Sequence, residues 1–157
     1  MIRGFATSGI NFAPSGIGTI FVSDTAISNN GTGIAVGSNG SAVSGALTRI
    51  TASGNGVGIL TSGANANVTI TDTVAGNNNY GIGASSSAVM VRNSTVSNNA
   101  VGISADQAAV VRVGQSTITA NNTGWQSTNN GQVQSYGNNN VTGNSSDGTL
   151  TTTVALQ

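Results

Sequence analysis

Very few side chains in this chain could take part in acid–base or ionic chemistry. The 157 residues include four arginines and four aspartates but no His, Cys, Lys or Glu. The only side-chain carboxylates are therefore Asp24, Asp72, Asp106 and Asp147. Because proton-transfer catalysis needs groups whose pKa lies near the working pH, this composition favours a function other than catalysis.

Asp24 and Asp72 form the first candidate pair for catalysis. They occupy the same position in repeats two units apart, with Arg49 between them. If the repeats stack as neighbouring strands do, the two positions lie about 9.6 Å apart, slightly beyond the roughly 6.5–9.5 Å typical of inverting glycosidases. We favour the alternative, an exposed ladder of alternating charges worth about 0–1 kcal/mol per pair. The residues that continue this ladder are Asn93, Gln115 and Asn138.

Arg92 and Arg112 form the second candidate pair. We expect them on the outward side of the first strands of adjacent repeats, where their guanidinium groups could converge. Two arginines could hold a carboxylated sugar through bidentate hydrogen bonds. No Asp shares this expected face, and solvated arginines are the simpler interpretation.

The composition also argues against several kinds of partner. Calcium needs six to eight oxygen ligands, usually including several carboxylates, so four scattered aspartates predict neither a metal site nor another cofactor. A net charge of zero without basic clusters argues against nucleic acid. No apolar stretch approaches the 18 residues of a membrane span, and the first residues lack the apolar core of a signal peptide.

The elements that would position these side chains follow from a repeat of 21 to 25 residues. Each repeat has an aliphatic residue, an Asn eight positions later and, three positions after that, usually a Gly. A period of this length indicates a solenoid. The aligned asparagines are Asn30, Asn55, Asn78, Asn99, Asn121 and Asn144. The aligned glycines are Gly33, Gly58, Gly81, Gly102 and Gly124, and Asp147 takes this place in the last repeat.

Three short strands are expected in each repeat. The first alternates in and out around the aliphatic residue, the second follows five residues later, and the third begins at the aligned Gly. Gly and Asn interrupt any helical period, whereas stacked repeats would form three parallel sheets around a narrow core. The sequence thus predicts an all-β fold, a right-handed parallel β-helix of six to seven coils in one domain, 1–157. The aliphatic residues are Val22, Leu47, Ile70, Val91 and Val113, with Tyr136 in the sixth repeat.

The Asn column has a structural explanation. Asn tolerates left-handed backbone geometry, and its amide can bond to the Asn of the next coil, so we predict a continuous Asn ladder rather than a ligand site. The Gly three residues later would let the chain turn tightly into the third strand. Trp125, which replaces Ile in the following column, is expected to fill the core.

The two ends of the chain differ. Residues 1–14 are expected to form an incomplete first coil, whose unpaired strand edge could promote self-association. Residues 149–157 are expected to form a closing strand.

The coil pattern, for example from Val91 to Ile103, resembles the right-handed parallel β-helix proteins of the pectate-lyase-like superfold. The tail from Ser135 through Asp147 and Gly148 resembles the last coil of uncharacterised bacterial members. The resemblance covers nearly the whole chain. It implies the fold, and it implies a location outside the cell or on its surface. Because such relatives usually carry a longer N-terminal region that includes Cys, it also implies a truncated or engineered fragment.

Enzymes of this superfold cleave acidic polysaccharides or glycosides, and the resemblance implies that they bind substrate on the outer face of the first sheet. One superfold hosts many chemistries, so three hypotheses stand. We favour a non-enzymatic structural or surface module that contacts a glycan or a partner. The alternatives are a carbohydrate-active fragment that uses Asp24 and Asp72 or Arg92 and Arg112, and a module that self-assembles through its first coil.

Overall fold

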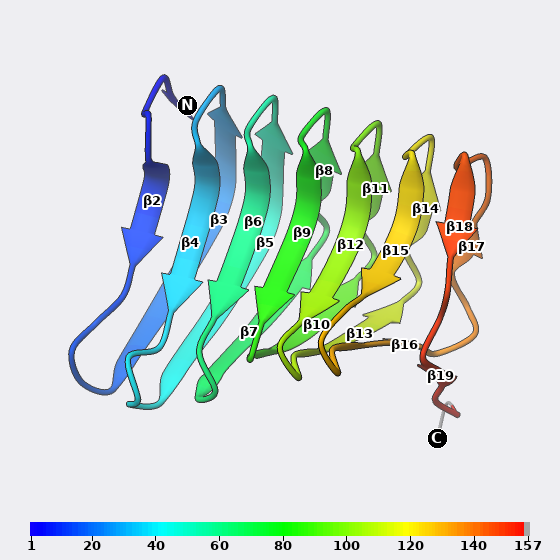
Figure 1. Ribbon diagram of the computed structural model, residues 1–157. Helices are drawn as coiled ribbons and strands as arrows, with labels where there is room; N and C mark the ends of the chain where they lie inside the picture. Colours follow the sequence, from blue (N-terminus) through cyan, green and yellow to red (C-terminus); the bar gives the residue numbers. More distant parts are fainter. Residues whose placement is uncertain (156–157) are drawn as a thin grey trace.

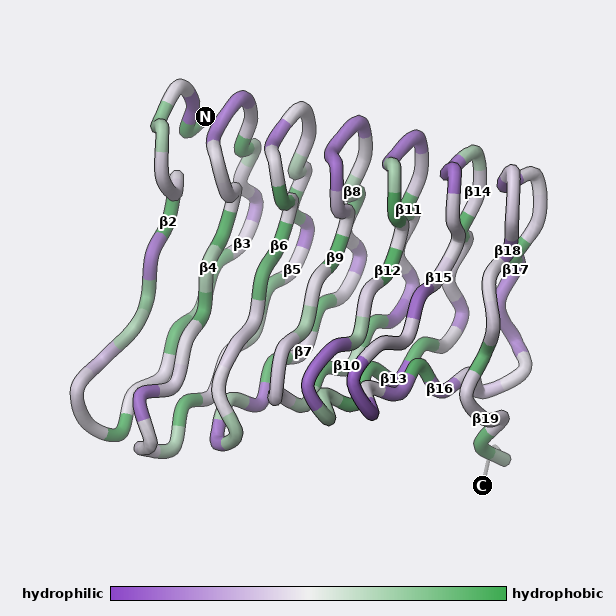
Figure 2. The backbone as a smooth tube through the Cα atoms, in the orientation of Figure 1, coloured by the Kyte–Doolittle hydropathy of each residue, from purple (hydrophilic) through white to green (hydrophobic). Residues whose placement is uncertain are grey.

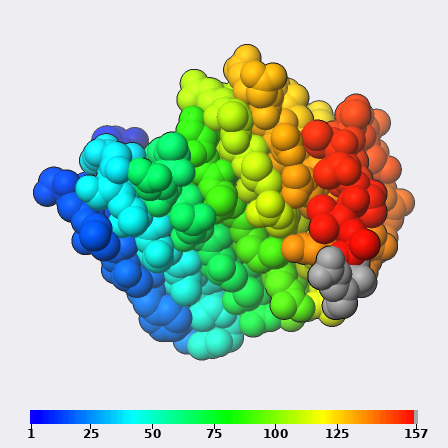
Figure 3. All heavy atoms as spheres, turned by 90° about the horizontal axis from the view of Figure 1, so that it is seen from below, coloured from blue at the N-terminus to red at the C-terminus, as the bar shows by residue number. Residues whose placement is uncertain are grey.

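The computed structural model describes residues 1–155 and shows a right-handed parallel β-solenoid of about six turns (Figure 1). The fold predicted from the repeat is therefore confirmed. The described residues form strands but no α-helix, so none that could cross a membrane. Successive coils of the described residues form adjacent bands of the surface (Figure 3).

Three strand positions recur in each coil, and every pairing between coils is parallel. The first and second strands of the early coils are continuous across the bend, as β3 (Gly18–Ser28) and β5 (Val43–Ser53). In later coils they separate into the pairs β7 (Ala66–Thr71) and β8 (Val74–Gly76), β10 (Ala88–Arg92) and β11 (Thr95–Ser97), β13 (Val110–Gly114) and β14 (Thr117–Thr119), and β16 (Gln132–Ser135) and β17 (Asn140–Val141). The first and second strands share one 12-stranded sheet, joined through the continuous β5, so the described strands form two sheets and not the three that were predicted. Within the larger sheet, we call the stack of first strands the first sheet.

The third strands form a separate seven-stranded sheet. Its members are β2 (Ser8–Phe12), β4 (Thr32–Gly37), β6 (Val57–Ser62), β9 (Tyr80–Ser85), β12 (Val101–Asp106), β15 (Thr123–Ser127) and β18 (Ser146–Gly148). The stack ends with β1 (Ile2–Arg3) beside β3 and with β19 (Thr152–Thr153) beside β16. Of the closing strand expected over 149–157, the described part contains only β19, and residues 156–157 lie outside the described residues.

The core consists of inward side chains that stack in register from coil to coil. Ile34, Ile59, Ile82 and Ile103 are fully buried and lie in one column, and Trp125 completes it at 7% exposure. Trp125 therefore fills the core, as predicted. Hydrophobic residues follow the strands, while hydrophilic ones gather at the bends (Figure 2). Burial of each such aliphatic side chain contributes roughly 1.5–3 kcal/mol.

The sixth coil departs from the predicted register. Val111 and Val113 pair with Val133 and Ser135, so the inward residue is the buried Ser135 and not Tyr136. One extra residue lies in this coil before the second strand, because Ile118 still pairs with Val141. A shift by one residue moves a side chain to the opposite face of a strand, and the prediction that Tyr136 lies in the core is therefore wrong.

The predicted Asn ladder is present at the bend between the second and third strands. Asn78 donates from both its backbone N–H and its Nδ2 to Asn99 Oδ1, at 2.9 and 3.1 Å, and Asn99 binds Asn121 in the same way. Nδ2 of Asn99 also donates to the Ala75 carbonyl at 3.0 Å. The ladder starts at Asn30, whose Oδ1 accepts the backbone N–H of Phe5. It runs through Asn55 to Asn144.

The residue in the left-handed backbone region precedes each ladder Asn, contrary to our expectation that the ladder residues themselves adopt it. Asn98, for example, has φ 58°, and Asn99 follows it with its side chain buried. The asparagines of the ladder are therefore required for their amides and not for their backbone tolerance. The left-handed residues are Asn29, Gly54, Asn77, Asn98, Ala120 and Gly143.

The aligned glycines are also required for a reason other than the predicted one. None of them has a positive φ, so they do not make the turn. A Cβ atom on Gly102 would lie 2.4 Å from the Gly124 carbonyl oxygen, and one on Gly33 would lie 2.4 Å from that of Gly58. Glycine is needed here because the backbones of successive coils approach too closely for a side chain.

A second ladder, which our sequence analysis missed, lies at the bend between the first and second strands. The Oγ of Ser94 accepts the backbone N–H of Thr73 at 3.2 Å and donates to the Arg92 carbonyl at 2.7 Å. One coil later, the Oγ of Ser116 accepts the backbone N–H of Ser94 and donates to the Gly114 carbonyl. The recurrence of a hydroxyl residue three positions after the aliphatic residue was the available signal. The members of this hydroxyl ladder are Thr73, Ser94 and Ser116, with Asn139 in the sixth coil.

Candidate functional site

A groove crosses the outer face of the first sheet near its C-terminal end. One hollow of this groove has a volume of about 400 Å³. Aromatic, amide and guanidinium groups line it together with small apolar residues. The lining residues are Met90, Arg92, Gly114, Gln115, Tyr136, Asn138, Val154 and Ala155. We call this hollow the outer groove.

Strand alternation and register build the outer groove. Met90 and Arg92 face outward from β10, and in β13 they pair with Arg112 and Gly114. Gly114 has no side chain, and the ring of Tyr136 lies over it, since a Cβ atom there would lie 3.1 Å from Tyr136 Cδ2. The inserted residue of the sixth coil thus places an aromatic ring in the groove, a feature that the repeat pattern did not reveal.

Arg92 is held in place by its neighbours. Its Nη2 donates to Gln115 Oε1 at 2.8 Å, and the backbone N–H of Gln115 donates to Asn138 Oδ1 at 2.9 Å. Arg92 also lines a second hollow of about 460 Å³ with Thr71, Asp72 and Asn93. Arg92 therefore lies between two adjoining hollows.

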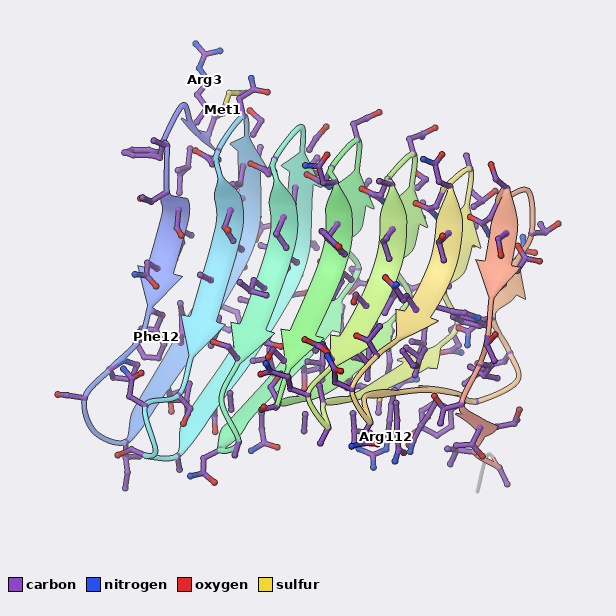
Figure 4. The ribbon with its side chains drawn as sticks, in the orientation of Figure 1. Met1, Arg3, Phe12 and Arg112 are labelled. Atoms are coloured by element: carbon purple, nitrogen blue, oxygen red, sulfur yellow. The ribbon has the colours of Figure 1, made fainter. Side chains whose placement is uncertain are left out.

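Arg112 lies on the same outer face but in another column. It is paired with Met90 and lines a third hollow of about 360 Å³, and its side chain points away from the core (Figure 4). The two arginines therefore belong to adjacent strands, as predicted, but line different hollows that share Met90. An extended ligand on this face could contact both.

Asp24 and Asp72 have separate partners. Arg49 binds Asp24 through two hydrogen bonds, from Nε at 2.6 Å and Nη2 at 2.7 Å, and these bonds lower the pKa of Asp24 below its usual value. Asp72 accepts instead from Asn93 Nδ2. The predicted ladder of alternating charges is therefore interrupted after Arg49. Asp24 and Arg49 form an ion pair, whereas Asp72 accepts a hydrogen bond from the neutral Asn93.

The backbone at these ladder positions is left-handed. Asp24, Arg49 and Asp72 have φ of 50°, 51° and 51°, and Asn93 and Gln115 follow the same conformation. This conformation is uncommon for residues other than glycine, and it turns the chain from the first strand into the second. The polar side chains of this column are therefore exposed at a bend that borders the first-sheet face, where Gln115 and Asn138 also line the outer groove.

The remaining carboxylates have local structural partners. Asp106 accepts hydrogen bonds from Thr128 Oγ1 and Asn129 Nδ2 at 2.8 and 2.7 Å, and these bonds lower its pKa. Asp147 accepts from Asn144 Nδ2 at 2.8 Å and ends the Asn ladder. Within residues 1–155 no three potential metal-binding carboxylates come together.

Comparison with known proteins gives one match. A family model described as a right handed beta helix region matches residues 1–152. No match is found among curated proteins or among solved structures.

Proposed function

Because the chain belongs to the right-handed β-helix family, we propose that it is a non-enzymatic binding module that holds a glycan in the outer groove. One observation carries this proposal. The groove combines an oriented arginine, two amide side chains and an aromatic ring, with no carboxylate among its described lining residues. These groups are suited to binding sugars, and none of them is a carboxylate that could form the acid–base pair of a glycosidase.

Each group has a distinct part in binding. Gln115 fixes the guanidinium of Arg92, which leaves donors for a sugar hydroxyl or a carboxylate. The ring of Tyr136 offers an apolar surface for the C–H face of a sugar, and its hydroxyl offers a polar end. The hollow of about 400 Å³ falls within the roughly 300–1,000 Å³ of small-ligand pockets, which fits one or two sugar units.

The carboxylates support a binding role over catalysis. A general acid that works near neutral pH needs a raised pKa, whereas the pKa values of Asp24 and Asp106 are lowered by their hydrogen bonds. Asp24 also accepts hydrogen bonds from two guanidinium nitrogens of Arg49. These two carboxylates are therefore suited to fixed structural contacts.

Calorimetric titration with neutral and acidic oligosaccharides tests the proposal. We expect Tyr136→Ala and Arg92→Ala each to weaken binding by about tenfold or more, in line with the roughly 1–3 kcal/mol of a well-placed polar or aromatic contact. Arg3→Ala is the matched control, because Arg3 projects from the bend at the opposite end (Figure 4). Binding that is unchanged in both groove variants would disprove the proposal.

A carbohydrate-active module is the second candidate. Asp72 and Arg92 line the same hollow of about 460 Å³, although the sequence had paired each of them with a different residue. A carboxylate beside a guanidinium is a combination that can act on an acidic glycan. Cleavage of a polysaccharide that Asp72→Asn abolishes would favour this activity over simple binding.

A structural role through self-association is the third candidate. Within the described residues, β2 and the first half of β3 pair on one side only. The same coil exposes Phe5, Ile17 and Phe21 at 52, 86 and 68%. Unpaired edges and exposed apolar groups favour strand addition. Light scattering over a concentration series would show growth in mass, and Phe21→Ser should reduce it.

A further inference from the structure

We propose that Asn39 is a site of spontaneous deamidation, at which the side-chain amide is converted to aspartate or isoaspartate. In this reaction the backbone nitrogen of the next residue attacks Cγ of the Asn and expels ammonia. Water then opens the resulting five-membered imide at either carbonyl. Glycine is the most favourable next residue, because it lacks a side chain and hinders the approach least.

The chain contains four Asn–Gly pairs, which allows an internal comparison. They begin at Asn30, Asn55, Asn39 and Asn130. The first two belong to the Asn ladder, and their amides are buried and bonded to the neighbouring coil. Gly31 N–H donates to the Phe5 carbonyl at 2.9 Å, and Gly56 N–H donates to that of Asn30 at 3.0 Å. In both pairs the attacking nitrogen and its target are therefore held in place.

The Asn130–Gly131 pair is protected from this reaction in a different way. Asn130 is exposed, but Gly131 N–H donates to the Thr128 carbonyl at 2.7 Å. Gly131 also packs against the preceding coil, because a Cβ atom there would lie 2.2 Å from the Ala105 carbonyl oxygen. The backbone at Gly131 cannot rotate toward the Asn130 side chain without local unfolding.

In the Asn39–Gly40 pair, neither of the two reacting groups is held in place. Asn39 and Gly40 are both exposed in the loop between β4 and β5. Among the described residues neither the Asn39 amide nor the Gly40 N–H makes a hydrogen bond. No atom lies within 4 Å of a Cβ position on Gly40. No hydrogen bond of the Gly40 nitrogen or of the Asn39 amide has to break before this nitrogen approaches Cγ.

The modification would change the surface of this chain markedly. Four arginines balance four aspartates, so one new carboxylate gives the neutral protein a net negative charge. An isoaspartate would also add an atom to the backbone of this loop, whose Gly40 carbonyl accepts a hydrogen bond from Asn65 in the next coil.

Peptide mapping by mass spectrometry after incubation at mildly alkaline pH tests the proposal. In the folded protein we expect Asn39 to react about tenfold or more faster than the other three, because each of those must first lose a hydrogen bond through local opening. In denaturant the four rates should converge, which would show that the fold causes the difference. A folded-state rate at Asn39 no higher than that at Asn130 would overturn the proposal.

The variant Asn39→Gln gives a second readout. A longer side chain would have to close a larger ring, so the acidic form that accumulates on ion exchange should disappear. If the same acidic form still accumulates, the modification lies elsewhere and the assignment to Asn39 is wrong. The loop is exposed, so this variant should fold as the original chain does.

Discussion

The two inner bends of the solenoid use one backbone design with different side chains. At both bends a residue in the left-handed region is usually followed by an inward polar residue, as in Asn93–Ser94 and Asn98–Asn99, although Ile50 follows Arg49. The first bend uses a hydroxyl, which accepts one N–H and donates to one carbonyl. The second uses an amide, which contacts the coils on both sides. The same backbone turn can thus be stabilised by a hydroxyl or by an amide. Only the amides hydrogen-bond to one another from coil to coil and so form a continuous column.

The contrast between the bends extends to the neighbouring backbone. Beside the Asn ladder the coils approach so closely that only glycine fits, as at Gly102 and Gly124. Every buried side-chain N or O atom of the described residues has a partner. The second bend therefore combines a continuous column of hydrogen-bonded amides with close approach of the neighbouring backbones, and we expect it to be more sensitive to substitution than the first bend.

The largest expected effect is that of Asn99→Leu. It would remove the acceptor of two Asn78 donors and the donor to the Ala75 carbonyl. Since each unsatisfied buried group costs about 1–3 kcal/mol, we expect a loss of about 4 kcal/mol in the free energy of unfolding, measured by urea denaturation. Asn39→Leu in the exposed loop is the control, and equal losses for the two variants would contradict the ladder.

The next effect is that of Gly102→Ala. The new Cβ would lie 2.4 Å from a backbone oxygen, so the coils must move apart at a cost of about 1–3 kcal/mol. Gly83→Ala is the matched control on the same type of strand, because its Cβ would lie 3.4 Å from Leu60 Cδ1. A thermal melt should show a lower midpoint for Gly102→Ala only, and equal midpoints would rule out close approach as the reason for glycine.

Ser94→Ala tests the first bend. It would leave the buried N–H of Thr73 without its acceptor, at a cost of about 1–2 kcal/mol, and it would remove one donor from the Arg92 carbonyl, which still accepts the N–H of Asp72. This is smaller than the loss at Asn99, because one group is orphaned instead of several. Ser97→Ala, on the outer side of the same coil, should cost less than Ser94→Ala. If Ser94→Ala proves as damaging as Asn99→Leu, the two bends contribute equally.

The smallest effect concerns pH. The chain has no His or Glu, and Asp24 and Asp106 have lowered pKa values in the folded state. A lowered pKa stabilises the folded state above the unfolded value of about 3.9, and this contribution is lost as the pH falls through the folded value. We therefore expect constant stability from about pH 5 to 7 and a decline only below about pH 4. A marked change near pH 6 would contradict this.

Some features of this molecule can be predicted from its sequence and others cannot. The Asn ladder could be predicted because its members recur at a regular period. In a stack of coils, the natural partner of each amide is the Asn of the next coil. The hydroxyl ladder was not predicted because the chain is rich in Ser and Thr. In the sequence nothing distinguishes the buried Thr73, Ser94 and Ser116 from the many exposed ones. Tyr136 was misplaced because the repeat was extended without a gap, whereas the structure inserts one residue in that coil.

The sequence by itself determined the coil, because in–out alternation and the spacing of Asn and Gly are local properties of the chain. The tertiary structure alone decided the partners of the charged groups and the shape of the candidate site. Arg49 binds Asp24 and not Asp72, and Arg92 shares a hollow with Asp72 instead of with Arg112. Such choices depend on the separation and stagger of side chains on neighbouring coils. These distances arise only when the coils stack.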